Sequence, residues 1–127
     1  MDCVAIGDSI AVGVSRPLGC ETRAYVGWPS NKIINLASGR YHATCIISAG
    51  SNDPKNPHLR INLKKIRDKA KCSSYVWIRP MHSIAAAATM SVAREYGDIV
   101  VSFIPSKDRV HPRSYSELAK KVLTITK

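Results

Sequence analysis

A serine stands directly after a short apolar run near the start of the chain. Residues 3–6 read Cys-Val-Ala-Ile, a pattern typical of a strand buried on both faces. Gly7 lets the backbone bend, and a helical turn starting at residues 11–13 would point its amide groups back at Ser9. Open α/β sheets place their chemistry at such carboxyl strand ends, so Ser9 is a candidate nucleophile. The alternative is that Asp8 or Ser9 only caps a helix.

A serine hydroxyl becomes a good nucleophile when a base accepts its proton and a third group orients that base. Asp108 and His111 lie three residues apart, in a loop predicted to follow the last strand. At this spacing the carboxylate can hold one ring N–H, and the other ring nitrogen is left to accept the proton of Ser9. We therefore predict a catalytic triad of Ser9, His111 and Asp108. An Asp–His pair at a helix entrance is the alternative.

Four short blocks, each after a predicted strand, resemble the pattern of the SGNH (GDSL-type) hydrolase family. They are Gly-Asp-Ser at residues 7–9, a lone glycine at Gly27, Gly-Ser-Asn-Asp at residues 50–53, and Asp-Arg-Val-His-Pro at residues 108–112. The resemblance runs from residue 3 to about residue 126. It implies a serine esterase that works through an acyl-enzyme and needs no metal or organic cofactor.

The resemblance also implies an oxyanion hole, a set of donors for the negative oxygen that forms during acyl transfer. In the family the donors are two backbone N–H groups and one asparagine amide, which correspond here to Ser9, Gly27 and Asn52. The alternatives are that Gly27 is present only because its turn requires a glycine, and that Asn52 only caps its own loop. We interpret Asp8 and Asp53 as supports that hold the two loops by hydrogen bonds to backbone.

Basic side chains are expected around the site. Lys107 and Arg109 flank Asp108, and Arg79 follows the neighbouring predicted strand. If all three line the mouth of the site, the substrate carries negative charge; the alternative is that they point to solvent. His82, in the loop after the same strand, could contact substrate, and the alternative is an ordinary loop histidine. Short loops predict a shallow, open site, which favours a small acyl group such as acetyl on a carbohydrate or cell-wall carrier.

The net charge of +10, from 19 Lys and Arg against 9 Asp and Glu, predicts attraction to polyanions. Residues 55–71 hold seven basic residues against one acid, Asp68, and a solvated helix face is the ordinary explanation. Two further functions stay open: a lytic enzyme that cuts peptidoglycan, and a non-catalytic cationic protein that binds a polyanion. Nucleic acid is not the partner we expect, because the sequence has no aromatic stacking series or nucleic-acid motif.

Cysteine spacing and apolar runs bear on the setting. Cys3, Cys20, Cys45 and Cys72 show no C-x-x-C pairing, so we expect no zinc site and interpret them as buried free thiols. We find neither an apolar run of membrane-spanning length nor a cleavable signal. The expectation is a chain without a membrane span that starts in the cytoplasm, with export by another route left open.

The length of 127 residues predicts one domain, residues 1–127. Expected strands occupy residues 3–6, 21–26, 43–48, 74–78 and 99–104. Expected helices begin near residue 11, follow caps at Ser30, Asn56 and Ser114, and occupy residues 84–96. This alternation predicts an α/β fold, a single three-layer αβα domain with a five-stranded parallel sheet. The family resemblance implies the flavodoxin-like strand order 2-1-3-4-5.

Overall fold

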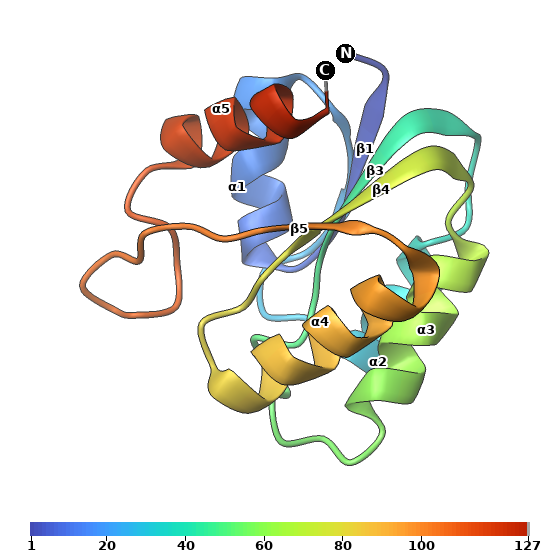
Figure 1. Ribbon diagram of the computed structural model, residues 1–127, viewed down its shortest axis with the longest axis vertical. Helices are drawn as coiled ribbons and strands as arrows, with labels where there is room; N and C mark the ends of the chain where they lie inside the picture. Colours follow the sequence, from blue (N-terminus) through green and yellow to red (C-terminus); the bar gives the residue numbers. More distant parts are fainter. Residues whose placement is uncertain (127) are drawn as a thin grey trace.

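The computed structural model describes residues 1–126 and shows an α/β domain with one five-stranded parallel sheet (Figure 1). The strand order is β2-β1-β3-β4-β5, and every neighbouring pair is parallel. The predicted α/β fold and its strand order are therefore confirmed. The strands are β1 (Cys3–Gly7), β2 (Glu21–Ala24), β3 (His42–Ser48), β4 (Cys72–Ile78) and β5 (Ile99–Val101).

Helices cover both faces of the sheet and complete three layers (Figure 1). One face carries α1 (Ser9–Leu18) and α5 (Tyr115–Ile125). The other carries α2 (Ser30–Ile33), the 3₁₀ helix η1 (Ile34–Leu36), α3 (Leu59–Lys69) and α4 (Ser83–Tyr96). None of the helices described for residues 1–126 combines the length and the apolar character that crossing a membrane requires.

The central strands contribute to two apolar clusters because successive side chains of a strand point to opposite faces. On β3, Ile46 packs with the helices α1 and α5, whereas Cys45 and Ile47 pack with α3 and α4. All three side chains are fully buried. This two-sided burial explains why the strand segments read as continuous apolar runs rather than alternating ones.

Helix α1 is longer than the sequence suggests, because the Arg-Pro-Leu-Gly segment at residues 16–19 is typical of a chain break. The helix instead runs through Pro17 and ends at Gly19, whose φ is 68°. Proline removes one hydrogen bond in the last turn, while Ile10, Val14 and Leu18 bury one continuous stripe of the helix in the core. Packing of that stripe outweighs the missing bond.

Other boundaries also differ from the expected ones: β2 ends at Ala24 rather than at residue 26, and β4 begins at Cys72 rather than at residue 74. Strand β5 ends at Val101, three residues early, and its last hydrogen bond runs from the Arg79 N–H to the Val101 carbonyl. Helix α3 begins at Leu59 rather than after a cap at Asn56. The Asn56 carboxamide oxygen accepts the His58 N–H, so this side chain closes the turn that precedes the helix.

The expectation of four free cysteines is wrong: the structure pairs Cys3 with Cys20 and Cys45 with Cys72. Each bridge joins neighbouring strands, with Cα–Cα distances of 4.9 and 5.7 Å. Cys20 directly precedes β2, which pairs with β1, and Cys72 opens β4, which pairs with β3. The disulfide pairing therefore follows from the order of the strands in the sheet, which cannot be derived from the spacing of the cysteines.

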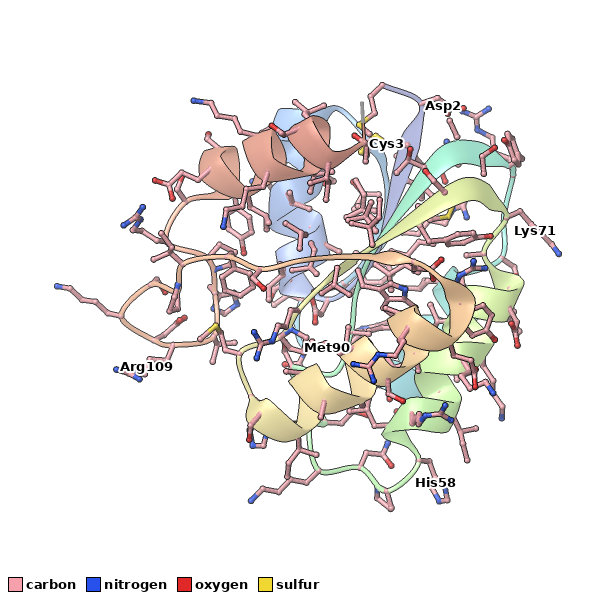
Figure 2. All side chains as sticks on the ribbon, in the orientation of Figure 1. Asp2, Cys3, His58, Lys71, Met90 and Arg109 are labelled. Carbon is pink, nitrogen blue, oxygen red and sulfur yellow. A yellow bond between two sulfur atoms is a disulfide. The ribbon has the colours of Figure 1, made fainter. Side chains whose placement is uncertain are left out.

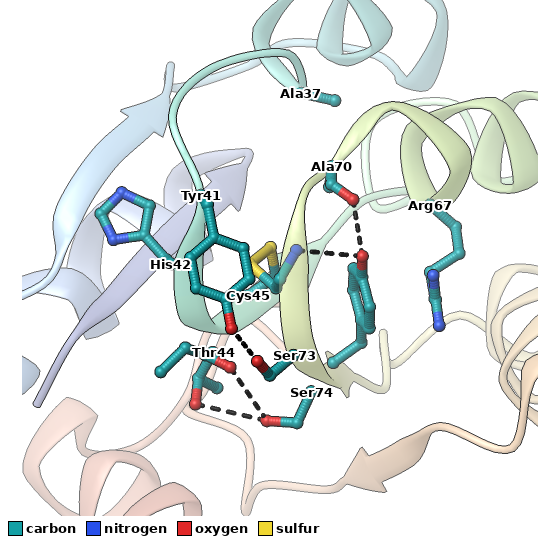
Figure 3. Close-up of a disulfide and its surroundings, with 12 residues drawn as sticks. Ala37, Tyr41, His42, Thr44, Cys45, Arg67, Ala70, Ser73 and Ser74 are labelled. Carbon is teal, nitrogen blue, oxygen red and sulfur yellow. Dashed lines mark hydrogen bonds between the residues drawn. A yellow bond between two sulfur atoms is a disulfide. The ribbon is translucent and has the colours of Figure 1, made fainter.

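Polar contacts around the Cys45–Cys72 bridge hold the start of β4 in place (Figure 3). The hydroxyl of Tyr75 donates to the Ala70 carbonyl at 2.6 Å and accepts the Cys72 N–H at 3.1 Å. The guanidinium of Arg67 lies 3.3 Å from the centre of the Tyr75 ring, a cation–π contact. These contacts tie the end of α3 to the start of β4 beside the disulfide.

Candidate active site

The turn between β1 and α1 places Ser9 at the carboxyl edge of the sheet. Gly7 has a φ of 146°, and a Cβ there would collide with the Ser48 carbonyl, so this position requires glycine. Asp8 caps α1 by accepting the Ile10 N–H at 3.1 Å. Ser9 comes directly after this turn and is the first residue of α1.

Ser9, His111 and Asp108 form one chain of hydrogen bonds. The Oγ of Ser9 lies 2.9 Å from Nε2 of His111, across 102 residues of sequence. Nδ1 of His111 lies 2.6 Å from Oδ2 of Asp108, a short hydrogen bond to a charged acceptor. The carboxylate takes the Nδ1–H, so Nε2 is left as the acceptor for the serine hydroxyl. This is the arrangement that base-assisted attack by a serine requires.

The Asp108 carboxylate also holds its own loop together. Besides the His111 ring, it accepts the backbone N–H groups of His111 and Val110, each at 2.9 Å, and the Ser106 hydroxyl at 2.8 Å. The His111 side chain, followed by these other donors, holds the pKa of Asp108 well below its ordinary value. The sequence interpretation missed Ser106; a hydroxyl two residues before the acid was the available signal.

The loop that carries this pair, residues 105–113, stands out from the domain after β5 (Figure 1). Two backbone bonds close its neck, from Ser106 N–H to the His111 carbonyl and from Arg113 N–H to the Ile104 carbonyl. At its tip Arg109 has a φ of 60°, a left-handed conformation that costs a non-glycine residue about 1–2 kcal/mol. The closed neck and this tight turn set the position of His111 over Ser9.

The two loops expected to supply further oxyanion donors are joined to each other. Gly27 has a φ of 80°, in a loop whose Tyr25 N–H donates to the Gly7 carbonyl, directly before the serine turn. The Asn52 amide donates to the Trp28 carbonyl at 3.1 Å. That bond uses one of its two hydrogens, so the second remains for a ligand. Within residues 1–126 the Gly27 N–H has no protein acceptor.

Asp53 supports these loops as the sequence interpretation proposed. Its carboxylate accepts both the backbone N–H of Ser30, at 3.0 Å, and the Ser30 hydroxyl, at 2.6 Å. It also accepts the Asn56 amide. Ser30 was expected to cap a helix, but it is the first residue of α2 and its hydroxyl donates to Asp53 instead. The interpretation of Asp53 as a support is confirmed, and that of Ser30 as a cap is wrong.

Asp8 is a buried acid directly behind the serine. Its Oδ1 accepts the Ser48 hydroxyl at 2.8 Å and the Ile10 N–H, which confirms its interpretation as a support of the turn. Its Oδ2 is fully buried and has no hydrogen-bond partner among residues 1–126. Burial raises the pKa of Asp8 to about 6.

The four basic residues expected around the site do not line one pocket. His82 and Arg109 line one pocket of about 280 Å³. Arg79 lines a second hollow, which shares Met81 with that pocket, and Lys107 lines a third hollow, to which Arg109 also contributes. Figure 2 shows Arg109 on the protruding loop. The pocket is lined by Ser51, Met81, His82, Arg109 and Val110. The expected cluster of charge is therefore divided, with His82 and Arg109 on one side.

The basic segment at residues 55–71 is partly neutralised by helix packing. Arg60 and Lys64 of α3 pair with Glu95 of α4 at 3.1 and 3.0 Å, and Arg67 pairs with Asp98 at 2.7 Å. The other four basic residues, Lys55, Lys65, Lys69 and Lys71, form no ion pair among the described residues. The segment thus serves helix packing as well as facing solvent.

Comparison with known proteins gives no family: no family model matches the chain, and neither a curated protein nor a solved structure does. Within residues 1–126 no three His, Cys, Asp or Glu side chains gather into a group that could hold a metal ion. The geometry of Ser9, His111 and Asp108 is therefore the basis for assigning chemistry to the site.

Proposed function

We propose that the protein is a serine esterase of the SGNH type. The observation that carries the proposal is the hydrogen-bonded chain from Ser9 through His111 to Asp108, built from segments 102 residues apart. The order of the three groups and the distances between them match the roles of nucleophile, base and orienting acid in a triad.

In the proposed mechanism Ser9 Oγ attacks the ester carbonyl while Nε2 of His111 takes the hydroxyl proton. His111 then gives that proton to the leaving alcohol as the carbon–oxygen bond of the ester breaks, which leaves an acyl group on Ser9. Water attacks this acyl group, with His111 taking a proton from the water and returning it to Ser9 Oγ as the acid leaves. Asp108 stays ionised throughout and holds the imidazole.

The negative oxygen formed in both steps needs donors, and the loops beside Ser9 offer them. We propose the Ser9 N–H, the Gly27 N–H and the second amide hydrogen of Asn52. As the first residue of α1, Ser9 has no helical acceptor for its N–H. The Tyr25–Gly7 and Asn52–Trp28 bonds hold the loops against each other, which supports a preorganised set of donors.

The openness of the site supports a small acyl group on a large carrier. A pocket lies beside the loop at residues 105–113, called the catalytic loop below. Two of its lining side chains, Met81 and Val110, are about 40% exposed, so the pocket cannot enclose a long lipid chain. Two residues before Gly27, Tyr25 is 54% exposed and packs against Trp28, with the ring centres 4.6 Å apart and the ring planes tilted by 31°. An exposed aromatic face of this kind suits a sugar ring, so we propose an acetyl-type ester on a carbohydrate or cell-wall carrier.

The two disulfides bear on where this activity takes place. Disulfides form and persist in oxidising compartments and are rare where thiols are kept reduced. The bridges therefore favour the export that the sequence left open over a protein that stays in a reducing cytoplasm. A cell-wall carrier fits that setting.

Hydrolysis of 4-nitrophenyl esters tests the proposal. We expect the acetate to be turned over faster than the dodecanoate, and Ser9→Ala to lower hydrolysis to the rate without enzyme. Ser73→Ala is the matched control and is expected to retain the parental rate, because Ser73 is exposed and lies at the amino end of β4, at the opposite edge of the sheet. Equal turnover by the parent and Ser9→Ala would reject the esterase.

The alternative functions give different results. A lytic enzyme would clear a suspension of peptidoglycan, and a non-catalytic polyanion-binding protein would bind in a strongly salt-dependent way that Ser9→Ala leaves intact. The pairing of Arg60, Lys64 and Arg67 with acids reduces the charge that the binding function would use.

A further inference from the structure

A pocket of about 280 Å³ opens beside the catalytic loop, where three separate segments meet. Ser51 precedes Asn52 in the loop after β3, and Val110 precedes His111 in the catalytic loop. Met81 and His82 come from the loop between β4 and α4. The pocket therefore adjoins both the proposed base and a proposed oxyanion donor, so a group bound there belongs to the substrate of the same site.

Arg109 gives the pocket a positive charge that the protein itself does not neutralise. It forms no ion pair within residues 1–126, whereas five of the other eight arginines do. The adjacent acid, Asp108, is already bonded to His111, Ser106 and two backbone N–H groups. The strained left-handed backbone at Arg109 fixes the direction in which this side chain leaves the loop.

His82 adds a second donor of defined direction. Its Nδ1 accepts the backbone N–H of Ile84 at 3.2 Å and so caps α4. A ring that accepts at Nδ1 carries its proton at Nε2 when neutral, and that N–H is free to donate to a ligand in the pocket. The Ser51 hydroxyl can also donate. The polar groups of the pocket are thus a cation and two hydrogen-bond donors, which matches an anion.

The remaining walls are apolar. Met81 is 40% exposed and Val110 is 39% exposed, and both line the pocket. A ligand that matches the whole lining therefore has a short apolar part and ends in a negative group. A neutral ester would leave the Arg109 charge without a partner, and a purely ionic ligand would leave the two apolar side chains uncovered.

We propose that this pocket binds a carboxylate carried by the ester substrate, and that Arg109 and His82 make the enzyme selective for anionic esters. The inference rests on the proposed esterase function and names its substrate class. The net charge of +10 agrees with it, because a basic protein attracts acidic substrates and acidic polymeric carriers.

The test compares two pairs of esters matched except for charge. For a carboxylate on the acyl side, the pair is 4-nitrophenyl hydrogen adipate and 4-nitrophenyl hexanoate; for the alcohol side, it is 3-acetoxybenzoate and 3-acetoxybenzamide. We expect kcat/KM of the parent to be about tenfold higher for the anionic ester in one pair, the size of one charge-assisted hydrogen bond. The pair that shows the preference identifies which side of the ester enters the pocket.

Two substitutions on the same loop separate the pocket from general charge. Arg109→Gln is expected to bring the ratio of anionic to neutral turnover to within about twofold of one, and Lys107→Gln to leave the parental ratio, because Lys107 lies outside the pocket. Arg109→Gly, which relieves the left-handed strain, is expected to lose the preference as Arg109→Gln does. Equal loss in Lys107→Gln would assign the preference to net charge and overturn the pocket.

Failure of this inference and failure of the esterase are distinguishable. Hydrolysis by the parent with equal kcat/KM within both pairs would overturn the pocket and leave the esterase standing. If no ester is hydrolysed, the pocket is tested by NMR with benzoate and benzamide. Shifts of the Met81 and Val110 amides with benzoate alone, absent in Arg109→Gln, would support the anion site, and no shift would overturn it.

Discussion

The side-chain amide of Asn52 donates to the backbone carbonyl of Trp28 across 3.1 Å. This bond joins the loop after β3 to the loop after β2, and Asp53 repeats the connection through Ser30. Both loops flank the carboxyl end of β1, where Ser9 lies. Residues from three strand ends are therefore held in one array before any substrate arrives, which is the condition for electrostatic stabilisation of a transition state.

Replacement of Asn52 by alanine tests whether this amide acts on substrate. We expect kcat to fall about 10²- to 10³-fold with little change in KM, because an oxyanion donor acts in the transition state. Asn56→Ala is the control, since Asn56 also bonds within this loop, to Asp53, without facing the site in our proposal. A similar loss in both variants would show that loop order, rather than the amide of Asn52, matters.

Substitutions in the loop at residues 105–113 are expected to lower kcat by different amounts. His111→Ala removes the base and is expected to lower kcat about 10²- to 10⁴-fold, and Asp108→Asn to have a large effect because it weakens the hold on the imidazole. Ser106→Ala removes only one of the bonds to Asp108 and is expected to cost less than about tenfold. Steady-state kinetics on one ester would measure all three, and a greater loss from Ser106→Ala than from Asp108→Asn would contradict this order.

Asp8 predicts a pH dependence of stability. Its carboxyl ionises near 3.8 in the unfolded chain but keeps its proton until about pH 6 in the folded one. The folded state binds more protons between these values, so this group lowers the free energy of unfolding as the pH rises through the window. Its stabilising contribution is complete below pH 3.8 and lost above about pH 6, and amounts to roughly 3 kcal/mol at most.

Asp8→Asn isolates that effect, because asparagine is an equally good helix cap and can still accept from Ile10 and Ser48. We expect the variant to gain stability relative to the parent as the pH rises from 4 to 7. Urea unfolding at a series of pH values measures the difference. If the free energies of unfolding of the parent and of Asp8→Asn change with pH in parallel across this range, Asp8 is already ionised in the folded protein at pH 4.

The disulfides predict a thiol count and a loss of stability on reduction. Denatured but unreduced protein is expected to show no free thiol, and reduced protein four. The bridges close loops with separations of 17 and 27 residues, and each is expected to contribute about 3 kcal/mol through the unfolded state. A thiol reagent and thermal unfolding with and without reductant measure both. Four reactive thiols without reductant would restore the free-cysteine interpretation.

The parallel sheet followed from the sequence because apolar runs and helix patterns alternate along the whole chain, whereas the order of its strands was implied by the resemblance to the SGNH family. Ser9, Asp108 and His111 could be singled out for a local reason: each follows the end of a strand, and parallel strands share one carboxyl edge. Residue types and spacing made them candidates, and the resemblance to the SGNH pattern grouped them into one proposed site.

Other features depend on contacts between distant segments, which spacing does not encode. The Cys45–Cys72 bridge follows from the pairing of β3 with β4, and the bond between Ser30 and Asp53 from the approach of two loops 23 residues apart. Pro17 reads as a break until its helix is seen packed in the core. Arg109 lines the pocket beside His82 and Lys107 does not, and the left-handed turn at Arg109 is not indicated by the local sequence.

Labelling with a fluorophosphonate probe tests the central claim most directly, since the probe reacts with a serine only when a neighbouring base and an oxyanion hole activate it. We predict stoichiometric labelling of the parent protein at Ser9 and none in Ser9→Ala, with strongly slowed labelling in His111→Ala. A parent protein that stays unlabelled, or a Ser9→Ala variant that is labelled equally, would contradict an activated serine at this site.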